Sequence, residues 1–267
     1  MGESFIFRQG EAPLLVSFPH DGTEIPAEIE ARMTEEARAR PDTDWHVARL
    51  YDFVAGLGAS TLRPRMSRYV VDLNRDPAGT ALYPGADNTG LVPTSTFDRE
   101  PIYLPGKEPD ASAVAERVER FFKPYHATIE REIARLLGTF GIVVVFDAHS
   151  IRSEVARFFD GTLPDLNLGT ASGASADETL ASRAFDVLSA SSSYSAVRDA
   201  RFKGGFITRH YGQPARGVHA VQLELSQKNY MREAPPYDFD DARADRLRPL
   251  LHRFVETLLD FARQGRR

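Results

Sequence analysis

The chain has no cysteine among its 267 residues, and this absence narrows the chemistry that it can perform. Without thiols there can be no disulfide, no thiolate nucleophile, no iron–sulfur cluster and no thiolate-bound zinc. Any metal ion in this protein must therefore be held by histidine, aspartate or glutamate side chains.

Long apolar runs and an excess of positive charge are also missing. No segment approaches the roughly 18 consecutive apolar residues of a transmembrane helix, and the N-terminus has no pattern of a signal peptide or of myristoylation. The net charge of −5 argues against a nucleic-acid-binding surface, which is normally basic. We expect a cytosolic protein that binds a small anionic molecule, as a monomer or a homo-oligomer, with no membrane or nucleic-acid partner.

Apolar and polar segments alternate in a way that indicates one α/β domain over residues 1–267, without a linker or repeat. Two stretches rich in glycine and proline, about 76–109 and 152–175, are expected to form long active-site loops. Strands are expected at 13–19, 69–73, 142–148 and 218–226, and helices at 43–58, 110–137 with a kink at Pro124, 177–190 and 241–262.

Strand-like apolar runs are followed by chemically useful side chains at four places. PLLVSFP leads to His20, YVVDL to Asn74 and Arg75, IVVVFDA to His149, and VHAVQL to Glu224. Because the carboxyl ends of strands in an open α/β sheet meet in one crevice, these distant residues are expected to share a pocket. Two imidazoles, a carboxylate and an arginine together predict a metal hydrolase that acts on an acidic substrate.

His20 and His149 are the candidate metal ligands, because zinc commonly takes two histidines and one carboxylate and leaves one position open for water. Asp44, Asp21 and Glu24 are all possible third ligands. We prefer Asp44, since it is expected at the start of the helix over 43–58, where a negative charge is favoured. The competing interpretation of His20 is a turn histidine that is bonded only to the backbone.

Glu224 lies inside an apolar strand, where an ionised carboxylate is costly without a partner. Burial beside a water molecule at a metal site would raise its pKa into the range of a general base. Strand alternation puts Gln222 and Glu224 on one face and leucine and valine side chains on the other. The alternative is therefore that Glu224 simply faces outward from the sheet.

Cations near these residues suit an acidic substrate. Asn74 and Arg75 offer an amide and a planar fork to a carboxylate, although a structural ion pair of Arg75 with Asp72 or Asp76 is the competing account. His126 and His252 fall in helical patterns and are expected to have no catalytic role. Further cations around Gly204 and Gly205 suit either an anion-binding loop or a solvated surface: Arg201, Lys203, Arg209 and His210.

Several long motifs resemble the N-formylglutamate amidohydrolase family: PHDGTEIP, PDTDWHVARLYDF, SRYVVDLNRDP, FDAHSIRS and RFKGGFITRHYGQPARGVHAVQLELSQKNYM. The resemblance spans nearly the whole chain. It implies a phosphorylase/hydrolase-like α/β fold related to the zinc carboxypeptidases, with a mixed central sheet and helices on both faces. It also implies hydrolysis of N-formyl-L-glutamate to formate and L-glutamate in histidine degradation.

Carried over residue by residue, the resemblance implies that a divalent metal ion, most often zinc, is bound by His20, Asp44 and His149, and that Glu224 is the base. It further implies that Asn74 and Arg75 bind one substrate carboxylate. We expect Arg209 or another cation of the 201–210 segment, such as Lys203 or His210, to bind the second. One departure is that many relatives have His-Ser-Gly where this chain has His20, Asp21 and Gly22.

Two other functions fit the same residues. One is a related zinc deacylase or carboxypeptidase that acts on a different N-acyl amino acid. The other is a binder of acidic amino acids that has kept the pocket and lost the chemistry, although the presence of both His20 and Glu224 speaks against it.

Overall fold

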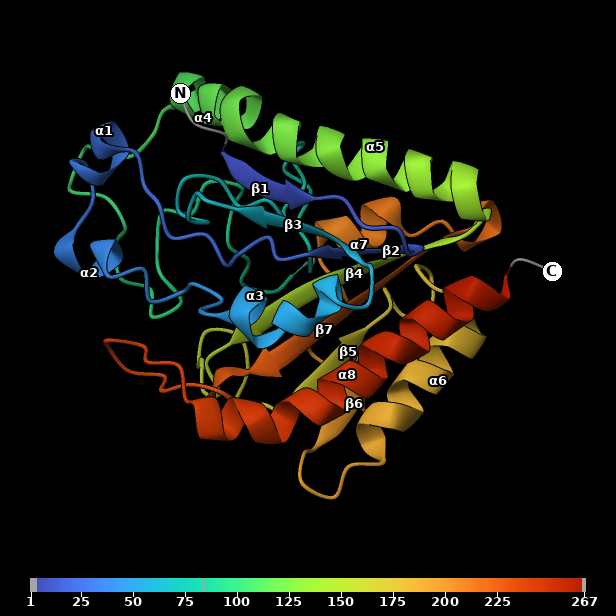
Figure 1. Cartoon of the computed structure of the whole chain (residues 1–267). Coiled ribbons are helices and arrows are strands. Elements are labelled where there is room, and N and C mark those ends of the chain that lie inside the picture. Colours follow the sequence, from blue (N-terminus) through green and yellow to red (C-terminus); the bar gives the residue numbers. More distant parts are fainter. Residues whose placement is uncertain (1–3, 84, 266–267) are drawn as a thin grey trace.

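The computed structural model describes residues 4–83 and 85–265, and within them one α/β domain is built around a seven-stranded mixed sheet (Figure 1). The strand order is β1-β3-β2-β4-β7-β5-β6. Neighbouring strands are parallel except for β1 with β3 and β5 with β7. The strands are β1 Phe5–Arg8, β2 Leu14–Ser17, β3 Ser60–Pro64, β4 Val143–Ile151, β5 Leu166–Gly169, β6 Ala196–Arg198 and β7 Val218–Ser226.

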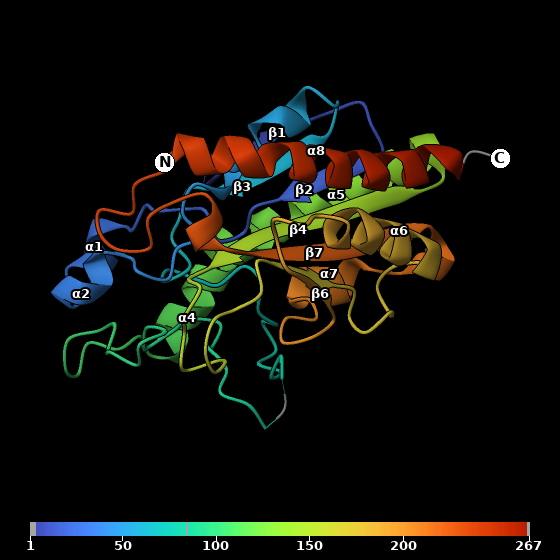
Figure 2. The same cartoon turned by 90° about the horizontal axis from the view of Figure 1, so that it is seen from below.

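Helices cover both faces of the sheet, as Figures 1 and 2 show from two directions. The long helix α5 and the short α7 pack on one face, and α8, α6 and α3 pack on the other. No helix in the described part of the chain combines the length and the apolarity that crossing a bilayer requires. The α-helices are α1 Ala27–Glu30, α2 Glu35–Arg38, α3 Val47–Leu50, α4 Ala111–Arg117, α5 Lys123–Phe140, α6 Glu178–Ser189, α7 Phe206–Tyr211 and α8 Asp241–Gln264.

The two central strands, β4 and β7, are buried along their whole length, so alternate side chains enter two different cores. Val144 and Phe146 of β4 pack under α8, while Val143 and Val145 pack toward α5. Because side chains alternate between the faces of a strand, Asp147 and His149 follow Val143 and Val145 onto the α5 face. This face ends in polar residues at the carboxyl ends of the strands.

Most of the predicted elements are present. The apolar runs at 13–19, 142–148 and 218–226 form the adjacent parallel strands β2, β4 and β7. The helices expected at 177–190 and 241–262 are α6 and α8, and aspartate side chains cap both at their N-termini. The mixed sheet with helices on both faces is confirmed.

The helix expected over 110–137 is one helical stretch, Ala111 to Phe140, with a change of winding in the middle. Asp110 caps it, since its carboxylate accepts a hydrogen bond of 2.8 Å from the backbone N–H of Ala113. Five residues, Val118–Phe122, form a π-helical turn that ends two residues before Pro124. The wider turn accommodates a proline that cannot donate a backbone hydrogen bond.

The prediction of a strand at 69–73 is wrong. These residues are buried, but their N–H groups bond within turns and to a loop: Val70 donates to Ser67 O and Asp72 donates to Leu91 O. The strand beside β2 is instead β3, Ser60–Pro64, whose sequence STLRP has a weaker apolar pattern. The apolar run therefore indicated burial and not strand pairing.

Two other expectations also need correction. The helix over 43–58 is shorter than expected, because His46 has a left-handed φ of 63° and the α-helix begins only after it, followed by a 3₁₀ turn at Asp52–Ala55. Asp44 is therefore not at the start of the helix, whose N-cap position is His46. The loop expected at 152–175 contains the short strand β5, which is antiparallel to β7.

Candidate active site

A cavity lies where β2, β4 and β7 end. It combines buried polar residues from these strands with residues of the 76–109 loop and of the segment after β6. Its lining residues are His20, Asp44, Arg68, Asn74, Arg75, Leu82, Tyr83, Asp87, Asn88, Thr89, Phe97, His149, Ser150, Ile151, Phe158, Arg201, Phe202, Gly205, Gln222 and Glu224.

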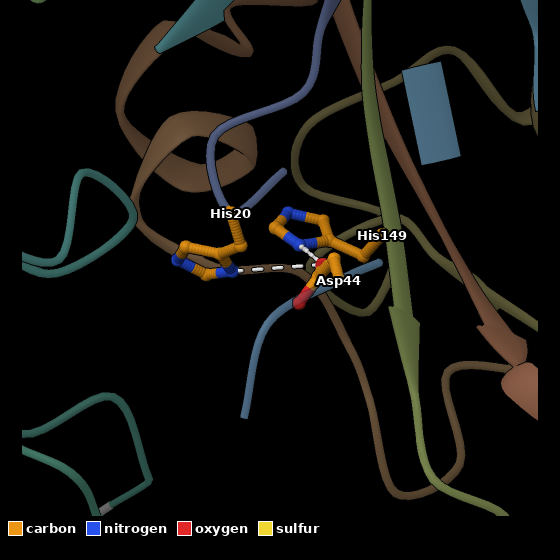
Figure 3. Close-up of side chains that lie close together, drawn as sticks. All are labelled: His20, Asp44 and His149. Carbon is orange, nitrogen blue, oxygen red and sulfur yellow. Dashed lines mark hydrogen bonds and ion pairs between the residues drawn. The ribbon is translucent and has the colours of Figure 1, made fainter. Parts of the chain in front are cut away.

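His20, Asp44 and His149 line this cavity and form a buried group, whose side chains point toward one another in Figure 3. The Nδ1 atoms of His149 and His20 lie 3.0 Å and 3.7 Å from the same carboxylate oxygen, Oδ2 of Asp44. The two imidazole rings are 4.8 Å apart between centroids. One potential ligand atom from each residue thus lies within 4.8 Å of the others, as a shared cation requires.

Three separate chain segments hold this group together. His20 follows β2 directly after Pro19, and His149 lies on β4. Asp44 is in the irregular segment before α3, where its backbone N–H donates to His20 O at 3.1 Å. Its carboxylate accepts a hydrogen bond of 3.0 Å from the backbone N–H of Ser150, so the position of Asp44 is fixed from both sides.

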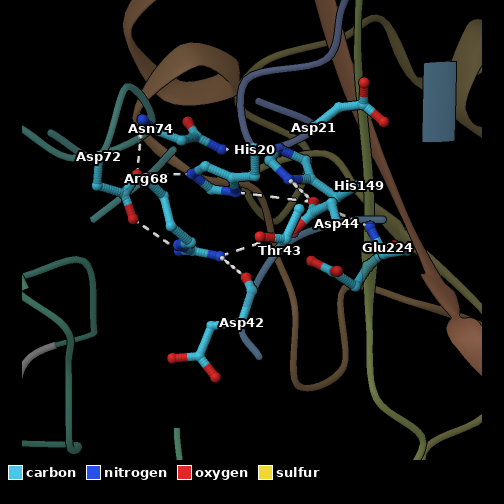
Figure 4. Close-up of polar contacts among 12 residues, drawn as sticks. His20, Asp21, Asp42, Thr43, Asp44, Arg68, Asp72, Asn74, His149 and Glu224 are labelled. Carbon is cyan, nitrogen blue, oxygen red and sulfur yellow. Dashed lines mark hydrogen bonds and ion pairs between the residues drawn. The ribbon is translucent and has the colours of Figure 1, made fainter. Parts of the chain in front are cut away.

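The other nitrogen of each imidazole faces a further carboxylate, and Figure 4 shows the contact of His20 with Asp72. Nε2 of His20 lies 2.7 Å from Oδ1 of Asp72, and Nε2 of His149 lies 3.0 Å from Oδ2 of Asp147. Asn74 also reaches Asp147, because its amide nitrogen donates to Oδ2 at 2.9 Å. Such carboxylates orient a ligating imidazole and fix which nitrogen carries the proton.

The charges in this group stabilise one another. Burial alone would raise the pKa of Asp44, but the imidazoles of His20 and His149 outweigh it and hold the pKa below its usual value. Burial alone would lower the pKa of His149, but Asp147 and Asp44 raise it well above the ordinary value. These charges therefore keep the Asp44 carboxylate ionised although it is buried.

Arg68 connects the group to a second layer of charge. Its Nη2 lies 2.6 Å from Oδ2 of Asp72, and its Nη1 lies 3.6 Å from Oδ1 of Asp44. A hydrogen bond of 3.4 Å from Nη1 to the carbonyl of Asp42 completes its contacts in Figure 4. Because Arg68 is buried and its guanidinium is bound by these groups, it serves as a fixed counter-charge.

Glu224 faces the same cavity from β7. Its Cα is directly opposite that of His149 in the register of β4 and β7, and only 7% of the residue is exposed. Burial raises the pKa of Glu224 to about 8, against the opposing effect of the His149 imidazole. The predicted alternation is confirmed, but the face that carries Gln222 and Glu224 is covered and does not point to solvent.

The two alternative ligands lie outside the group. Asp21 is buried, but its carboxylate pairs with Arg63 and accepts from the backbone N–H of Ala48, and burial raises its pKa to about 7. Glu24 pairs with Arg65 at 3.6 Å, and 56% of its side chain is exposed. The donor group that includes His20 and His149 contains Asp44 and neither of these residues.

Asn74 and Arg75 both line the cavity, although each is also held by the protein. The amide oxygen of Asn74 accepts from the backbone N–H of Ile207 at 2.7 Å. Arg75 donates from Nε to Thr89 O at 3.2 Å and from Nη2 to Thr89 Oγ1 at 2.8 Å, and its Nη1 is 4.0 Å from Asp72. Thr89 thereby fixes the direction of the guanidinium.

The other predicted cations are placed differently. Arg209 and His210 line a neighbouring cavity that shares Asn74 and Arg75 with the first, and Lys203 lines neither of the two. The cation of this segment that reaches the cavity containing Glu224 is Arg201.

Sequence reasoning missed the supporting roles of Arg68, Asp72 and Asp147. Asp147 was open to prediction, because it precedes His149 by two residues on one strand and must share its face. Asp72 was considered only as a partner of Arg75. Asp72 belongs to the segment 69–73 that was expected to be a strand, and Arg68 directly precedes it, so the contacts that they make through turns were not expected.

Comparisons with known proteins point to one family. A sequence model of the N-formylglutamate amidohydrolase family matches residues 12–231. The chain is 49% identical over 264 residues to the N-formylglutamate deformylase of Pseudomonas aeruginosa, with 99% of each protein covered. It is 45% identical over 259 residues to the N-formylglutamate deformylase of Pseudomonas putida, with 97% of each covered.

Solved structures share the fold. The crystal structure of N-formylglutamate amidohydrolase from Ralstonia eutropha JMP134 superimposes with a TM-score of 0.82 at 25% identity, covering 98% of this chain and 99% of that one. A gene product of Agrobacterium tumefaciens gives a TM-score of 0.75 at 16% identity, covering 97% and 96%. The second similarity extends to the fold alone.

Proposed function

The chain belongs to the N-formylglutamate amidohydrolase family, and from this we propose that it hydrolyses N-formyl-L-glutamate to formate and L-glutamate with a divalent metal ion at His20, Asp44 and His149. The observation that carries the proposal is the meeting of these three residues with buried Glu224 in one cavity. The relation to zinc carboxypeptidases, zinc as the native metal, and a place in cytosolic histidine degradation belong to the same proposal.

The donor set fits such an ion. Two imidazole nitrogens and one carboxylate oxygen are common ligands of catalytic zinc, and ligand atoms of a tetrahedral site with bonds of about 2.1 Å lie about 3.4 Å apart. The Nδ1 to Oδ2 separations of 3.0 and 3.7 Å are close to that spacing. When bound, the ion supplies a Lewis acid for the formyl oxygen and lowers the pKa of water.

Glu224 is the proposed base. Its carboxylate takes a proton from the attacking water as the water oxygen bonds to the formyl carbon, and it delivers that proton to the amide nitrogen as the C–N bond breaks. The products are formate and the free amino group of glutamate. Burial keeps the Glu224 carboxyl poised near neutral pH, and positive charge in the same cavity favours its ionised form.

Arg75, with Asn74 beside it, is proposed to bind one of the two carboxylates of the substrate. The two hydrogen bonds from Arg75 to Thr89 hold the guanidinium in one orientation, so little freedom is lost on binding. The second carboxylate needs a second cation, for which the 201–210 segment offers Arg201, Lys203, Arg209 and His210.

The proposal is tested by measuring formate release from N-formyl-L-glutamate and bound metal on one sample. Protein treated with a chelator should lose activity and regain it with Zn²⁺ or another divalent ion. Asp44→Asn should lose the metal, whereas Asp21→Asn should retain it, because Asp21 pairs with Arg63. Full turnover in metal-free protein would reject metal dependence, and no formate from the metal-loaded protein would reject the substrate.

A further inference from the structure

Three arginines line the cavity that contains Glu224, and two of them are already bound by the protein. Arg68 lies against the carboxylates of Asp72 and Asp44. Arg75 donates three hydrogen bonds, to both oxygens of Thr89 and to its neighbouring carbonyl. The third, Arg201, lies in the segment between β6 and α7 and has a different environment.

Arg201 has no carboxylate partner among the residues that the structure describes. Its only hydrogen bond within them is from Nε to the carbonyl of Phe158, at 2.5 Å. That bond anchors the base of the guanidinium and leaves the two terminal nitrogens, Nη1 and Nη2, free to bind a ligand. Besides Glu224, two carboxylates line the cavity, and both have other partners. Asp44 contacts the histidines, and Asp87 pairs with Arg157.

Aromatic rings surround the guanidinium of Arg201. Its Cζ lies 5.0 Å from the ring centroid of Tyr83, 5.3 Å from that of Phe202 and 5.7 Å from that of Phe158. Such rings stabilise a cation and exclude water from its faces, while leaving its edge open. A carboxylate matches that edge, since a guanidinium presents parallel N–H groups to two oxygens.

We propose that Arg201 binds the side-chain carboxylate of the substrate and thereby selects acidic N-formyl amino acids over neutral ones. The inference rests on the proposed function and adds the residue that determines specificity. Arg75 then takes the α-carboxylate beside the catalytic group, and Arg201 takes the second carboxylate within the aromatic cluster. Arg209 is the rival, because its guanidinium lies 5.5 Å from the ring of Tyr83, yet it lines the neighbouring cavity.

The test compares two substrates that differ only in this charge, N-formyl-L-glutamate and N-formyl-L-glutamine, using the metal-loaded enzyme. Arg201→Gln should lower kcat/KM for N-formyl-L-glutamate about 100-fold, as expected for a bidentate bond to a charged group, and leave that for N-formyl-L-glutamine nearly unchanged. Arg201→Lys, which keeps the charge but loses the fork, should lower only the N-formyl-L-glutamate value, by about 10-fold.

Arg198→Gln is the matched control, because it removes a positive charge three residues away whose partner is Glu178. It should keep the preference of the wild type. The inference is overturned if kcat/KM of the Arg201 variants falls equally for both substrates or for neither. It is also overturned if Arg209→Gln, and not Arg201→Gln, loses the preference for N-formyl-L-glutamate. If the wild type releases formate from N-formyl-L-glutamate in these cases, the proposed function stands and only the role of Arg201 is rejected. No formate from the wild type rejects both.

Discussion

Nε2 of His20 lies 2.7 Å from Oδ1 of Asp72, and both side chains are buried. With Nε2 held in this way, Nδ1 of the imidazole faces Asp44 at 3.7 Å. Asp72 is held in turn by Arg68 at 2.6 Å. Burial would raise the pKa of Asp72, but His20 and Arg68 hold it well below its usual value, so the Asp72 carboxylate stays ionised.

Asp72→Asn should weaken metal binding about 10- to 100-fold, the usual cost of losing a carboxylate that orients a ligating histidine. The amide can still accept a hydrogen bond, but it no longer supplies the negative charge. The dissociation constant is measured by competition with a chelating dye. Asp245→Asn, at an exposed aspartate that pairs with Arg248, is the control. Equal affinities in the two variants would show that Asp72 does not support His20.

Glu224→Gln should lower kcat for formate release by about 10² to 10⁴, the range of general-base catalysis. Metal content should be unchanged, because Glu224 is not part of the His20, Asp44 and His149 group. The substitution preserves shape and removes only the proton acceptor. Glu256→Gln, at an exposed glutamate of α8, should behave like the wild type. A nearly normal rate in Glu224→Gln would remove this residue from the mechanism.

The central part of the site could be predicted because the central strands carry a strong signal. β2, β4 and β7 are buried on both faces and read as apolar runs, so His20, His149 and Glu224 were expected at one edge of the sheet. Their meeting follows from parallel strand order, which places His149 opposite Glu224. The prediction that these residues meet needs only the strand order and no knowledge of a bound ion or ligand.

The periphery could not be predicted in the same way. β3 lies between β1 and β2 and carries an exposed Arg63, whereas the buried run at 69–73 is hydrogen-bonded through turns. The apolar pattern therefore indicated the wrong segment as a strand. The α-helix does not extend N-terminal to Val47, because His46 has a left-handed φ. No local sequence pattern indicates this conformation. Which cation of the 201–210 segment enters the cavity depends on loop packing around Tyr83, and this is set by contacts distant in sequence.

His126 should make folding sensitive to acid. Burial lowers the pKa of its imidazole to about 4, although the hydrogen bond to the carbonyl of Leu73 opposes the effect. Nε2 then carries the proton, and Nδ1 accepts from the hydroxyl of Tyr211 at 2.9 Å. As the pH falls below about 6.5 the unfolded imidazole binds a proton that the folded one excludes, so stability is lost between about pH 6.5 and 4.

The loss amounts to about 3 kcal/mol at most for a shift of this size. In His126→Gln, which keeps a donor for Leu73, the free energy of unfolding should fall less than in the wild type between pH 7 and pH 5. Denaturant titrations at the two pH values measure this free energy. Metal-free protein is used so that release of metal at low pH does not contribute to the pH dependence. An identical pH dependence would mean that His126 titrates normally.

Gly205→Ala should damage the site through Asn74. A Cβ at position 205 would lie 2.3 Å from Nδ2 and 2.5 Å from Cγ of Asn74, far inside contact distance. Asn74 has little room to retreat, because its amide joins Asp147 to the backbone of Ile207 at the start of α7. Overpacking of this kind typically costs about 1–3 kcal/mol of stability.

Displacing Asn74 also removes a partner of Asp147, which orients His149, so metal affinity should fall together with the free energy of unfolding. Gly138→Ala is the matched control, since Gly138 is exposed in α5 and a Cβ there meets no atom within 4 Å. That variant should keep its metal and gain about 0.5–1 kcal/mol, because alanine favours the helix. If Gly205→Ala also keeps full metal affinity, then Asn74 either moves freely or contributes nothing to the position of His149.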